Sequence, residues 1–309
     1  MRRRFIGGQL MALAMLLPLP ALAWTDEEWQ TFFDRGQVST VIDIDNDTLL
    51  LSGSDRFYTS GLRLSKNYRL PSNDGWESLG WRVGQQLYTA SSIRRLPEAL
   101  AVLDRPYAGW LYAGLVYRRE ANDGSEIAYG LDIGCLGPCA GGEWSQESLH
   151  RALHQPRPKA WSTQIGTEPG AVVMVGARGP YYALGPQMDL RPGVAVRLGN
   201  IFTDISAEGT LRAGVMRTDP QGSGRYVFFR VAARAVAHDA TLQGGWLTGT
   251  EARTVSPKHL TGEAELGVQW QLPRWALRVS VIRRSNEING LSESLGRQDF
   301  LRLSLMFTR

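Results

Sequence analysis

The sequence predicts an all-β fold: a closed antiparallel transmembrane β-barrel of about twelve strands, with a short helix in an extracellular loop. Three observations lead to this prediction. The chain begins with an export signal, no later segment approaches the ~18 consecutive apolar residues that a membrane-spanning helix requires, and many segments alternate between apolar and polar residues. Such alternation gives a strand one face for an apolar medium and one for a polar medium.

The N-terminus has the three parts of a secretory signal peptide. A basic run of arginines at positions 2–4 precedes a largely apolar stretch over 5–19, and Ala21-Leu22-Ala23 provides a cleavage site of small residues. No cysteine stands directly after this site, which excludes a lipoprotein. We therefore predict a signal peptide over residues 1–23 and a single outer-membrane barrel domain over residues 24–309.

The alternating segments are the candidate strands. Every second residue is apolar over 264–272 and again over 301–307. A soluble β-sandwich would show the same alternation, but the segments approach the ~9–11 residues of a tilted spanning strand. Their polar faces also carry charges that a packed core would reject and a wet lumen accepts: Glu263, Glu265, Arg278 and Arg302.

Aromatic residues near the predicted strand ends are typical of the girdles at membrane interfaces. These residues are Trp110, Tyr112, Trp246, Trp270 and Trp275. The twelve predicted strands begin near Thr40, Tyr58, Glu77, Gly109, Ser125, Ala171, Gln187, Thr203, Gly224, Gly262, Trp275 and Asp299. An even number of strands places both termini on the periplasmic side and leaves no unpaired edge in lipid.

The charge of the chain gives no reason to expect nucleic acid as a partner. The formal net charge is +4, and without the three signal arginines 31 basic side chains face 30 acidic ones. Lysine occurs only at positions 66, 159 and 258, so the cations are almost all arginine. Arginine suits a phosphate-bearing surface, although codon bias explains the same composition. Cys135 and Cys139 are close enough for a disulfide across a Gly-Pro turn, and two free thiols are the alternative.

One segment interrupts the strands. Residues 144–154 lack alternation and are predicted to form a short helix, preceded by two glycines and ended by Pro156, in the longest loop of the chain. Gln146, His150 and His154 are spaced four apart and share one helix face. A histidine there is a candidate general base. The alternative is a surface helix with incidental histidines.

An acidic cluster lies in the first strand. Asp43, Asp45 and Asp47 alternate with Ile44 and Asn46, and oxygen ligands of this kind suit a hard cation such as calcium. The alternative is an acidic lumen patch balanced by inward arginines such as Arg63. The motifs of EF-hands, of Gly-x-Ser-x-Gly hydrolases and of HExxH metalloproteases are absent from the sequence.

Several short motifs, in order along roughly residues 40–170, resemble those of the outer-membrane lipid A 3′-O-deacylases of the LpxR type. The motifs are Asn46-Asp47, Asp55-Arg56-x-Tyr58-Thr59-x-Gly61, Leu87-Tyr88-Thr89, Asp104-Arg105-Pro106-Tyr107-Ala108-Gly109-Trp110, Gly137-Pro138 and Gln146-x-x-x-His150. The resemblance implies a twelve-stranded barrel in the bacterial outer membrane, active on the lipid A of lipopolysaccharide. We expect no nucleic-acid partner and a monomer.

The resemblance also implies roles for individual residues. The catalytic set would be His150, Asn46, Asp47, Thr59 and Gln146. His150 would activate water, Asn46 and Asp47 would hold a Ca²⁺ cofactor that stabilises the oxyanion, and Thr59 and Gln146 would line the pocket.

Further residues would bind substrate and metal, and here the sequence departs from the family pattern. Arg94 and Tyr58 would bind substrate, but Arg94 stands where the family has lysine. No carboxylate follows the helix at 154–157, so Glu168 is the substitute metal ligand that we expect.

The resemblance thus predicts a calcium-dependent carboxylic ester hydrolase that removes the 3′-linked acyloxyacyl chain of lipid A. A non-catalytic barrel, either a pore or a lipopolysaccharide-binding protein, is one alternative. An outer-membrane phospholipase is another. The helix that carries Gln146 and His150 favours the enzyme, because a pore does not need such a helix outside its lumen.

Overall fold

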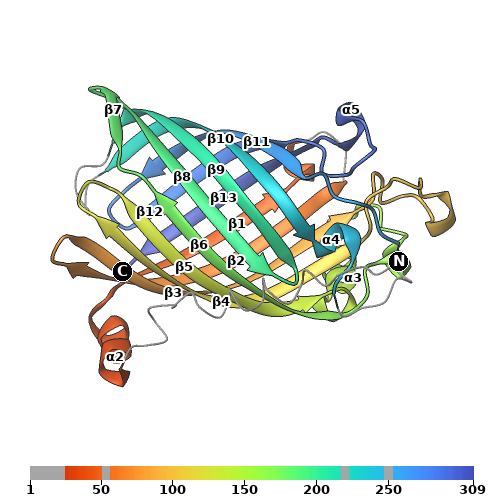
Figure 1. Cartoon of the computed structure of the whole chain (residues 1–309), viewed down its shortest axis with the longest axis horizontal. Coiled ribbons are helices and arrows are strands. Elements are labelled where there is room, and N and C mark those ends of the chain that lie inside the picture. The colour runs from red at the N-terminus through yellow and green to blue at the C-terminus, as the bar shows by residue number, and fades with distance from the viewer. Residues whose placement is uncertain (1–24, 51–55, 217–222, 247–252) are drawn as a thin grey trace, which may run out of the picture.

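The fold is a single closed barrel of tilted strands (Figure 1). The computed structural model describes residues 25–50, 56–216, 223–246 and 253–309. The predicted signal peptide and Asp55 of the quoted motif lie outside these residues. Within them, no helix is both long and apolar enough to cross a bilayer.

The strands are β1 (Gln37–Asn46), β2 (Phe57–Ser72), β3 (Gly75–Thr89), β4 (Ala108–Ala121), β5 (Glu126–Leu136), β6 (Glu168–Arg178), β7 (Tyr182–Gly185), β8 (Met188–Gly199), β9 (Phe202–Val215), β10 (Gly224–Asp239), β11 (Leu260–Gln271), β12 (Trp275–Arg284) and β13 (Gln298–Thr308). The α-helices are α2 (Asp26–Arg35), α3 (Gly142–Ala152), α4 (Ala240–Gln243) and α5 (Glu293–Gly296). The 3₁₀ turns are η2 (Thr48–Leu50), η3 (Pro97–Ala99), η4 (Pro138–Ala140) and η5 (Trp161–Thr163).

The first and last strands close the barrel, because β1 pairs with β13. β6 pairs with β8, and among the described strands the short β7 between them pairs only with β8. Of the 13 described strands, 13 − 1 = 12 therefore form the wall. The predicted closed antiparallel barrel is confirmed, and each of the twelve predicted strand starts lies within three residues of an observed one.

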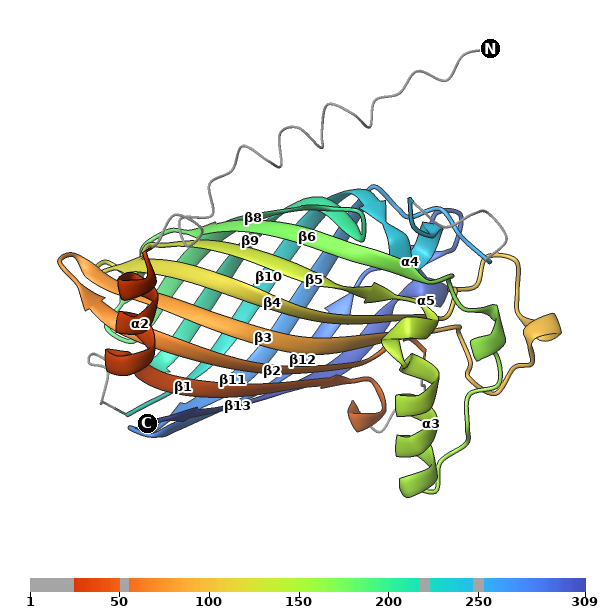
Figure 2. The same cartoon turned by 90° about the horizontal axis from the view of Figure 1, so that it is seen from below.

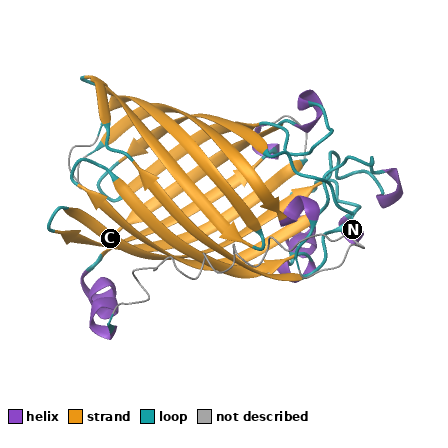
Figure 3. Cartoon of the chain, in the orientation of Figure 1, coloured by secondary structure: helices purple, strands orange, loops and turns teal. Residues whose placement is uncertain are grey.

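The two ends of the barrel differ in their connections. Short turns at 73–74, 122–125 and 272–274 lie at the end that holds the start of β1 and the end of β13. Long connections at 90–107, 137–167 and 240–259 lie at the other end, where α3, α4 and α5 gather (Figure 3). Outer-membrane barrels have short periplasmic turns and longer extracellular loops, so the long connections are extracellular.

The two faces of the wall have opposite chemistry, which accounts for the alternation in sequence. Outward side chains are apolar and accessible, as in Leu266 at 62% and Phe307 at 56% exposure. Inward side chains are charged and paired. The inward pairs include Arg63–Asp43, Arg302–Asp45, Arg82–Asp132, Arg212–Asp189, Arg230–Glu263, Arg278–Glu265 and Arg284–Glu263. Pairing compensates the desolvation of these charges.

The aromatic girdle was predicted only in part. Trp270 and Trp275 are accessible on the outer face. Trp110 and Tyr112 are instead buried inside the barrel, where their rings stack at 5.9 Å between centroids, so their assignment to the girdle is wrong. The alternation of β4 turns both inward, and the end of the lumen is packed with apolar side chains rather than left wet. That cluster comprises Tyr58, Tyr88, Ala108, Trp110, Tyr112, Leu136, Ile165, Val172, Ile201, Phe202, Ala240, Ile282 and Phe300.

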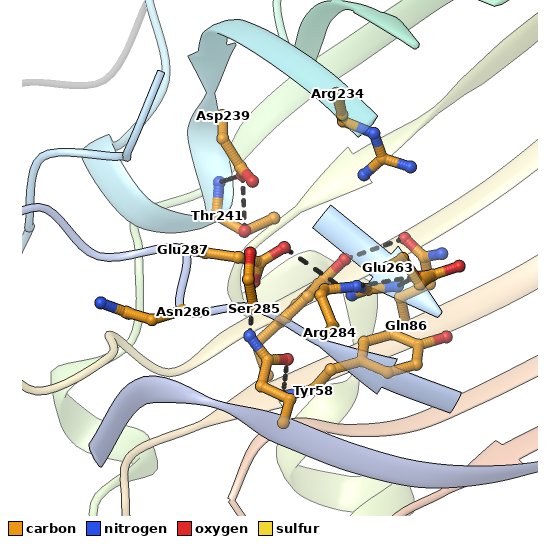
Figure 4. Close-up of polar contacts among 12 residues, drawn as sticks. Tyr58, Gln86, Arg234, Asp239, Thr241, Glu263, Arg284, Ser285, Asn286 and Glu287 are labelled. Atoms are coloured by element: carbon orange, nitrogen blue, oxygen red, sulfur yellow. Dashed lines mark hydrogen bonds and ion pairs between the residues drawn. The ribbon is translucent and has the colours of Figure 1, made fainter. Parts of the chain in front are cut away.

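A buried polar network closes the same end. Arg105, only 1% exposed, donates to Glu287 at 2.6 Å and to Thr241 at 2.9 Å, and its guanidinium lies 4.4 Å from the ring centre of Tyr88. Arg284 extends from the end of β12 toward Glu287 (Figure 4). Among the described residues, the extracellular mouth is thus crossed by apolar packing and ion pairs.

Helix α2 was not predicted. It lies outside the barrel at the periplasmic end (Figure 2). Phe32 is buried against Leu79 and Tyr117 of the outer wall, and Phe33 meets the ring of Tyr68 edge-on at 4.9 Å. The helix therefore covers part of the outer wall near the start of β1.

Candidate functional site

Helix α3 packs against the outside of the barrel at its extracellular end (Figure 2). Gly141 begins the helix with φ of +66°, a conformation that glycine adopts without strain. A Cβ atom on Gly142 would lie 2.7 Å from Trp161 and 3.0 Å from Leu87 of β3. Glycine is therefore required for the close approach of α3 to the wall.

Polar contacts fix the same junction. Gln85 of β3 donates its Nε2–H to the Ala140 carbonyl at 2.7 Å, and Ser145 donates its hydroxyl to Gln85 Oε1 at 2.9 Å. A disulfide joins Cys135, near the end of β5, to Cys139 in η4. Of the two alternatives for these cysteines, the structure has the disulfide. The segment that precedes α3 is thus fixed to β3 by hydrogen bonds and to β5 by the disulfide.

The buried face of α3 carries the predicted catalytic residues. Gly142, Gln146 and His150 are buried and follow each other at intervals of four. His154 was expected on this face, but α3 ends at Ala152 and His154 is exposed with φ of +54°. The expectation for His154 is wrong because the helix ends two residues before it.

The imidazole of His150 is oriented by the chain that follows the helix. Its Nδ1 lies 2.6 Å from the carbonyl oxygen of Pro156, which can only accept. Nδ1 therefore carries the proton, and in the neutral ring Nε2 is the basic nitrogen. This tautomer and burial are what a general base requires.

Gln146 is held by a residue that sequence reasoning did not select. Trp161 donates its indole N–H to Gln146 Oε1 at 2.9 Å, and Trp161 itself packs edge-on against Tyr107 at 5.1 Å. The Nε2 group of Gln146 is buried and has no hydrogen-bond partner within the described part of the chain. Buried polar groups are usually hydrogen-bonded, so an unpartnered buried amide donor calls for an explanation.

The second half of the site lies where β1 ends. Asp47 is 2% exposed; its Oδ2 accepts from the backbone N–H of Arg56 at 2.6 Å, and its own N–H donates to the carbonyl of Thr59 at 3.3 Å. Asn46 Oδ1 accepts from the backbone N–H of Leu49 at 3.2 Å. These contacts fold the end of β1 and η2 against the start of β2.

Thr59 connects this half to β3. The register between β2 and β3 shifts between Tyr58 and Ser60, so Thr59 forms a bulge. Its hydroxyl lies 2.7 Å from that of Thr89, and both residues are buried. Bulges commonly re-aim side chains beside active sites. Thr89 belongs to a quoted motif but had no predicted role.

A chain of contacts joins the two halves along the outer wall. Asp47 contacts Thr59, and Thr59 contacts Thr89 at the end of β3. Leu87, two residues before Thr89 and on the same face, packs at the start of α3. The extracellular ends of β1, β2 and β3 are therefore adjacent, with α3 beside them.

Arg94 lies beside the segment that orients His150. Arg94 is exposed in the connection after β3, and the preceding Ile93 carbonyl accepts from the backbone N–H of Lys159 at 3.0 Å. Lys159 follows Pro156 by three residues. This places Arg94 beside the segment that follows α3, and its substrate-binding role stays a prediction.

Two predicted site residues lie elsewhere. Tyr58 points into the lumen, donates to Asp45 at 2.9 Å and lines a polar lumen cavity of about 550 Å³. Glu168 begins β6, four strands beyond β2, and its Oε1 accepts from Asn200 at 2.7 Å and from the backbone N–H of Trp246 at 3.0 Å. The structure does not bring either residue to the outer-wall site.

The oxygen donors near β1 match calcium in chemical type. The Asn46 amide and the Asp47 carboxylate are neighbouring hard ligands. Each already accepts a backbone hydrogen bond but retains further lone pairs. Within the described residues, no group of three or more His, Cys, Asp or Glu side chains is arranged to hold a metal. A cation here would need additional oxygens from main chain, water or substrate.

Comparison with known proteins agrees with this architecture. The family model described as outer membrane protein LpxR matches residues 10–308. LpxR from Salmonella typhimurium has a similar structure, with a TM-score of 0.73 and 24% identity over 87% of this chain and 99% of that chain. The β domain of the Bordetella autotransporter BrkA gives a TM-score of 0.49 and 11% identity over 89% of this chain and 99% of that chain. No curated protein sequence matches the chain. Because the family match spans nearly the whole sequence, the chain belongs to the LpxR family of bacterial outer-membrane proteins.

Proposed function

We propose that this protein is a lipid A deacylase, an ester hydrolase that removes the 3′-linked acyloxyacyl chain of lipid A in the outer leaflet. Its family membership supports an outer-membrane enzyme of this class. The single observation that carries the proposal is the orientation of His150. This residue is buried on α3, outside the barrel, and its Nδ1 is hydrogen-bonded to the carbonyl of Pro156 in the segment after the helix. A structural surface helix does not need an oriented, buried imidazole.

His150 would act as general base and then as general acid. Its Nε2 removes a proton from water, whose oxygen forms a bond with the ester carbonyl carbon. When the tetrahedral intermediate collapses, the bond to the sugar oxygen breaks and the imidazolium returns the proton to that oxygen. The products are a free acid and a sugar hydroxyl, without an acyl-enzyme.

The remaining residues would position the ester. The buried Nε2–H₂ of Gln146 would donate to an ester or amide oxygen, and Thr59, whose hydroxyl pairs with that of Thr89, would line the pocket. Asn46 and Asp47 would hold the expected Ca²⁺, which would supply Lewis-acid polarisation of the carbonyl when bound. Arg94 would bind an anionic group of the substrate.

The alternatives have less support. A pore requires an open lumen, whereas Arg105, Glu287 and the aromatic cluster cross its extracellular mouth. A phospholipase would use the same chemistry on a different lipid. The assay below separates this alternative from the proposal.

The experiment is mass spectrometry of lipids after incubation with the purified, reconstituted barrel. We expect lipid A to lose the mass of one acyloxyacyl group and phosphatidylethanolamine vesicles to release no fatty acid. Release from the vesicles without change in lipid A would replace the proposal with phospholipase activity. A chelator should abolish the reaction and added Ca²⁺ should restore it; unchanged activity in chelator would remove the cation from the mechanism.

A further inference from the structure

The segment after α3, residues 156–160, is a cationic arm that carries Arg157 and Lys159 and bends at Lys159. Pro158 and Ala160 are buried, whereas Arg157 and Lys159 between and beside them are exposed. Pro156 and Pro158 restrict the backbone on either side of Arg157. Exposure alternates with burial along the arm, so both cations are presented to solvent.

The arm adjoins a second group of cations. The backbone hydrogen bond from Lys159 to Ile93 places the arm next to Arg94 and Arg95, both exposed. The guanidinium of Arg95 lies 3.8 Å from the buried carboxylate of Asp104, which partly balances the positive charge of Arg95.

Few anions lie near the remaining cations of this surface. Arg157, Lys159 and Arg94 make no side-chain ion pair or hydrogen bond with any described residue. The exposed carboxylate on the connection between β3 and β4 is that of Glu98. The surface is thus cationic and its donors are unused within the described ranges.

The neighbouring surface is apolar. Trp144, Leu149 and Leu153 of the α3 region are exposed on the outside of the barrel, at 76%, 48% and 57%. A cationic arm that directly follows a helix with exposed apolar side chains matches an amphiphile with an anionic headgroup and acyl chains. Guanidinium and ammonium groups together suit a phosphate.

We infer that Arg157 and Lys159 bind a phosphate group of the lipid substrate and thereby make the enzyme selective for phosphorylated over dephosphorylated lipid. This inference rests on the proposed deacylase function. The arm also carries the Pro156 carbonyl that orients His150, 2.6 Å from Nδ1. A phosphate held at Arg157 is consequently held one residue from the group that fixes the general base.

The test compares bisphosphorylated lipid A with the same lipid lacking one phosphate. The variant is Arg157→Gln with Lys159→Gln, and the matched control is Arg274→Gln, an exposed arginine in the periplasmic turn between β11 and β12. We expect the wild type and the control to prefer the bisphosphorylated lipid in kcat/KM by roughly tenfold. The double variant should reduce that preference toward one.

A binding measurement separates this inference from the proposed function. His150→Ala protein in detergent micelles is titrated with both lipids and intrinsic tryptophan fluorescence is recorded. Preference for the bisphosphorylated lipid that is lost when Arg157 and Lys159 are also replaced supports the inference, whether or not the wild type hydrolyses either lipid. Equal affinity for both lipids, or a preference that survives the double replacement, overturns it.

Discussion

The ion pair between Arg105 and Glu287 makes the most quantitative prediction. The two residues are 182 positions apart in sequence, their charged atoms lie 2.6 Å apart, and their side chains are 1% and 11% exposed. Removing one partner of a buried pair leaves an uncompensated charge, at a cost of about 3–5 kcal/mol. Glu287 retains a hydrogen bond from Gln298 at 2.8 Å. We therefore expect Arg105→Met to lower the free energy of unfolding by about 3 kcal/mol.

The pKa of Glu287 is shifted in the direction that ion pairing requires. Burial alone would raise this pKa, but Arg105, Arg284 and the hydrogen bond from Gln298 lower it from 4.5 to about 2. A depressed folded-state pKa stabilises the fold above the unfolded value of 4.5, and the stabilisation is lost as pH falls toward 2. The shift corresponds to roughly 3 kcal/mol.

The assay is guanidinium unfolding of the reconstituted barrel at about pH 7 and at about pH 3. Arg105→Met and Glu287→Gln should each destabilise the barrel at the higher pH, and the double variant should lose less than the sum. The difference between wild type and Glu287→Gln should shrink at the lower pH. Arg119→Gln, which breaks an exposed pair with Asp74, is the matched control and should change little. Single variants within 1 kcal/mol of wild type, or a difference that is independent of pH, would refute this reasoning.

Three further changes test how the site is assembled. Gly142→Ala would place a Cβ 2.7 Å from Trp161; the resulting displacement of α3 should lower kcat/KM for lipid A by roughly 100-fold, and unchanged activity would contradict the packing. Thr59→Val removes one of two paired hydroxyls. It should lower the free energy of unfolding by about 1–2 kcal/mol in denaturant and reduce activity. A variant equal to wild type in both measurements would argue against the pair. Replacing Cys135 and Cys139 with serine opens a loop of sequence separation 4 and should cost roughly 2 kcal/mol; an identical thermal midpoint would show that the disulfide does not stabilise α3.

The barrel was predictable because two solvents act on each strand. Outward residues such as Leu266 face lipid and are apolar, whereas inward residues such as Glu265 face the lumen and are charged. Apolar and polar residues therefore alternate along the sequence with a period of two. The disruption of this period predicted α3 to within two residues at each end. The predicted helix extends two residues too far because Leu153 and His154 are compatible with a helix by sequence, whereas the helix ends at Ala152.

The lumen mouth was not predictable from these rules. Trp110 and Tyr58 were assigned to an interface and a substrate site, but alternation does not reveal that the lumen becomes apolar at one end. The Asp104-Arg105 motif had no readable role because the partners of Arg105 are 136 and 182 residues away. Glu168 was linked to the metal by its charge, whereas register turns it inward toward Asn200.

The residues of the proposed outer-wall site were selected by their resemblance to family motifs rather than from spacing or charge. Spacing alone placed Gln146 and His150 on one face, but the residues that hold them, Trp161 and Pro156, lie beyond the helix and carry no local signal. Contacts with later segments therefore determine how these two side chains are oriented.

The most direct test is lipid A mass spectrometry with His150→Ala, using His154→Ala as the matched control. His154 is exposed beyond the end of α3, and His150 is buried on its inner face. Loss of a general base should lower the rate by roughly 10²–10⁴-fold, so we predict that His150→Ala leaves lipid A intact while His154→Ala shortens it as the wild type does. Shortening of lipid A by a folded His150→Ala barrel at the wild-type rate would contradict the assignment of His150 as the base.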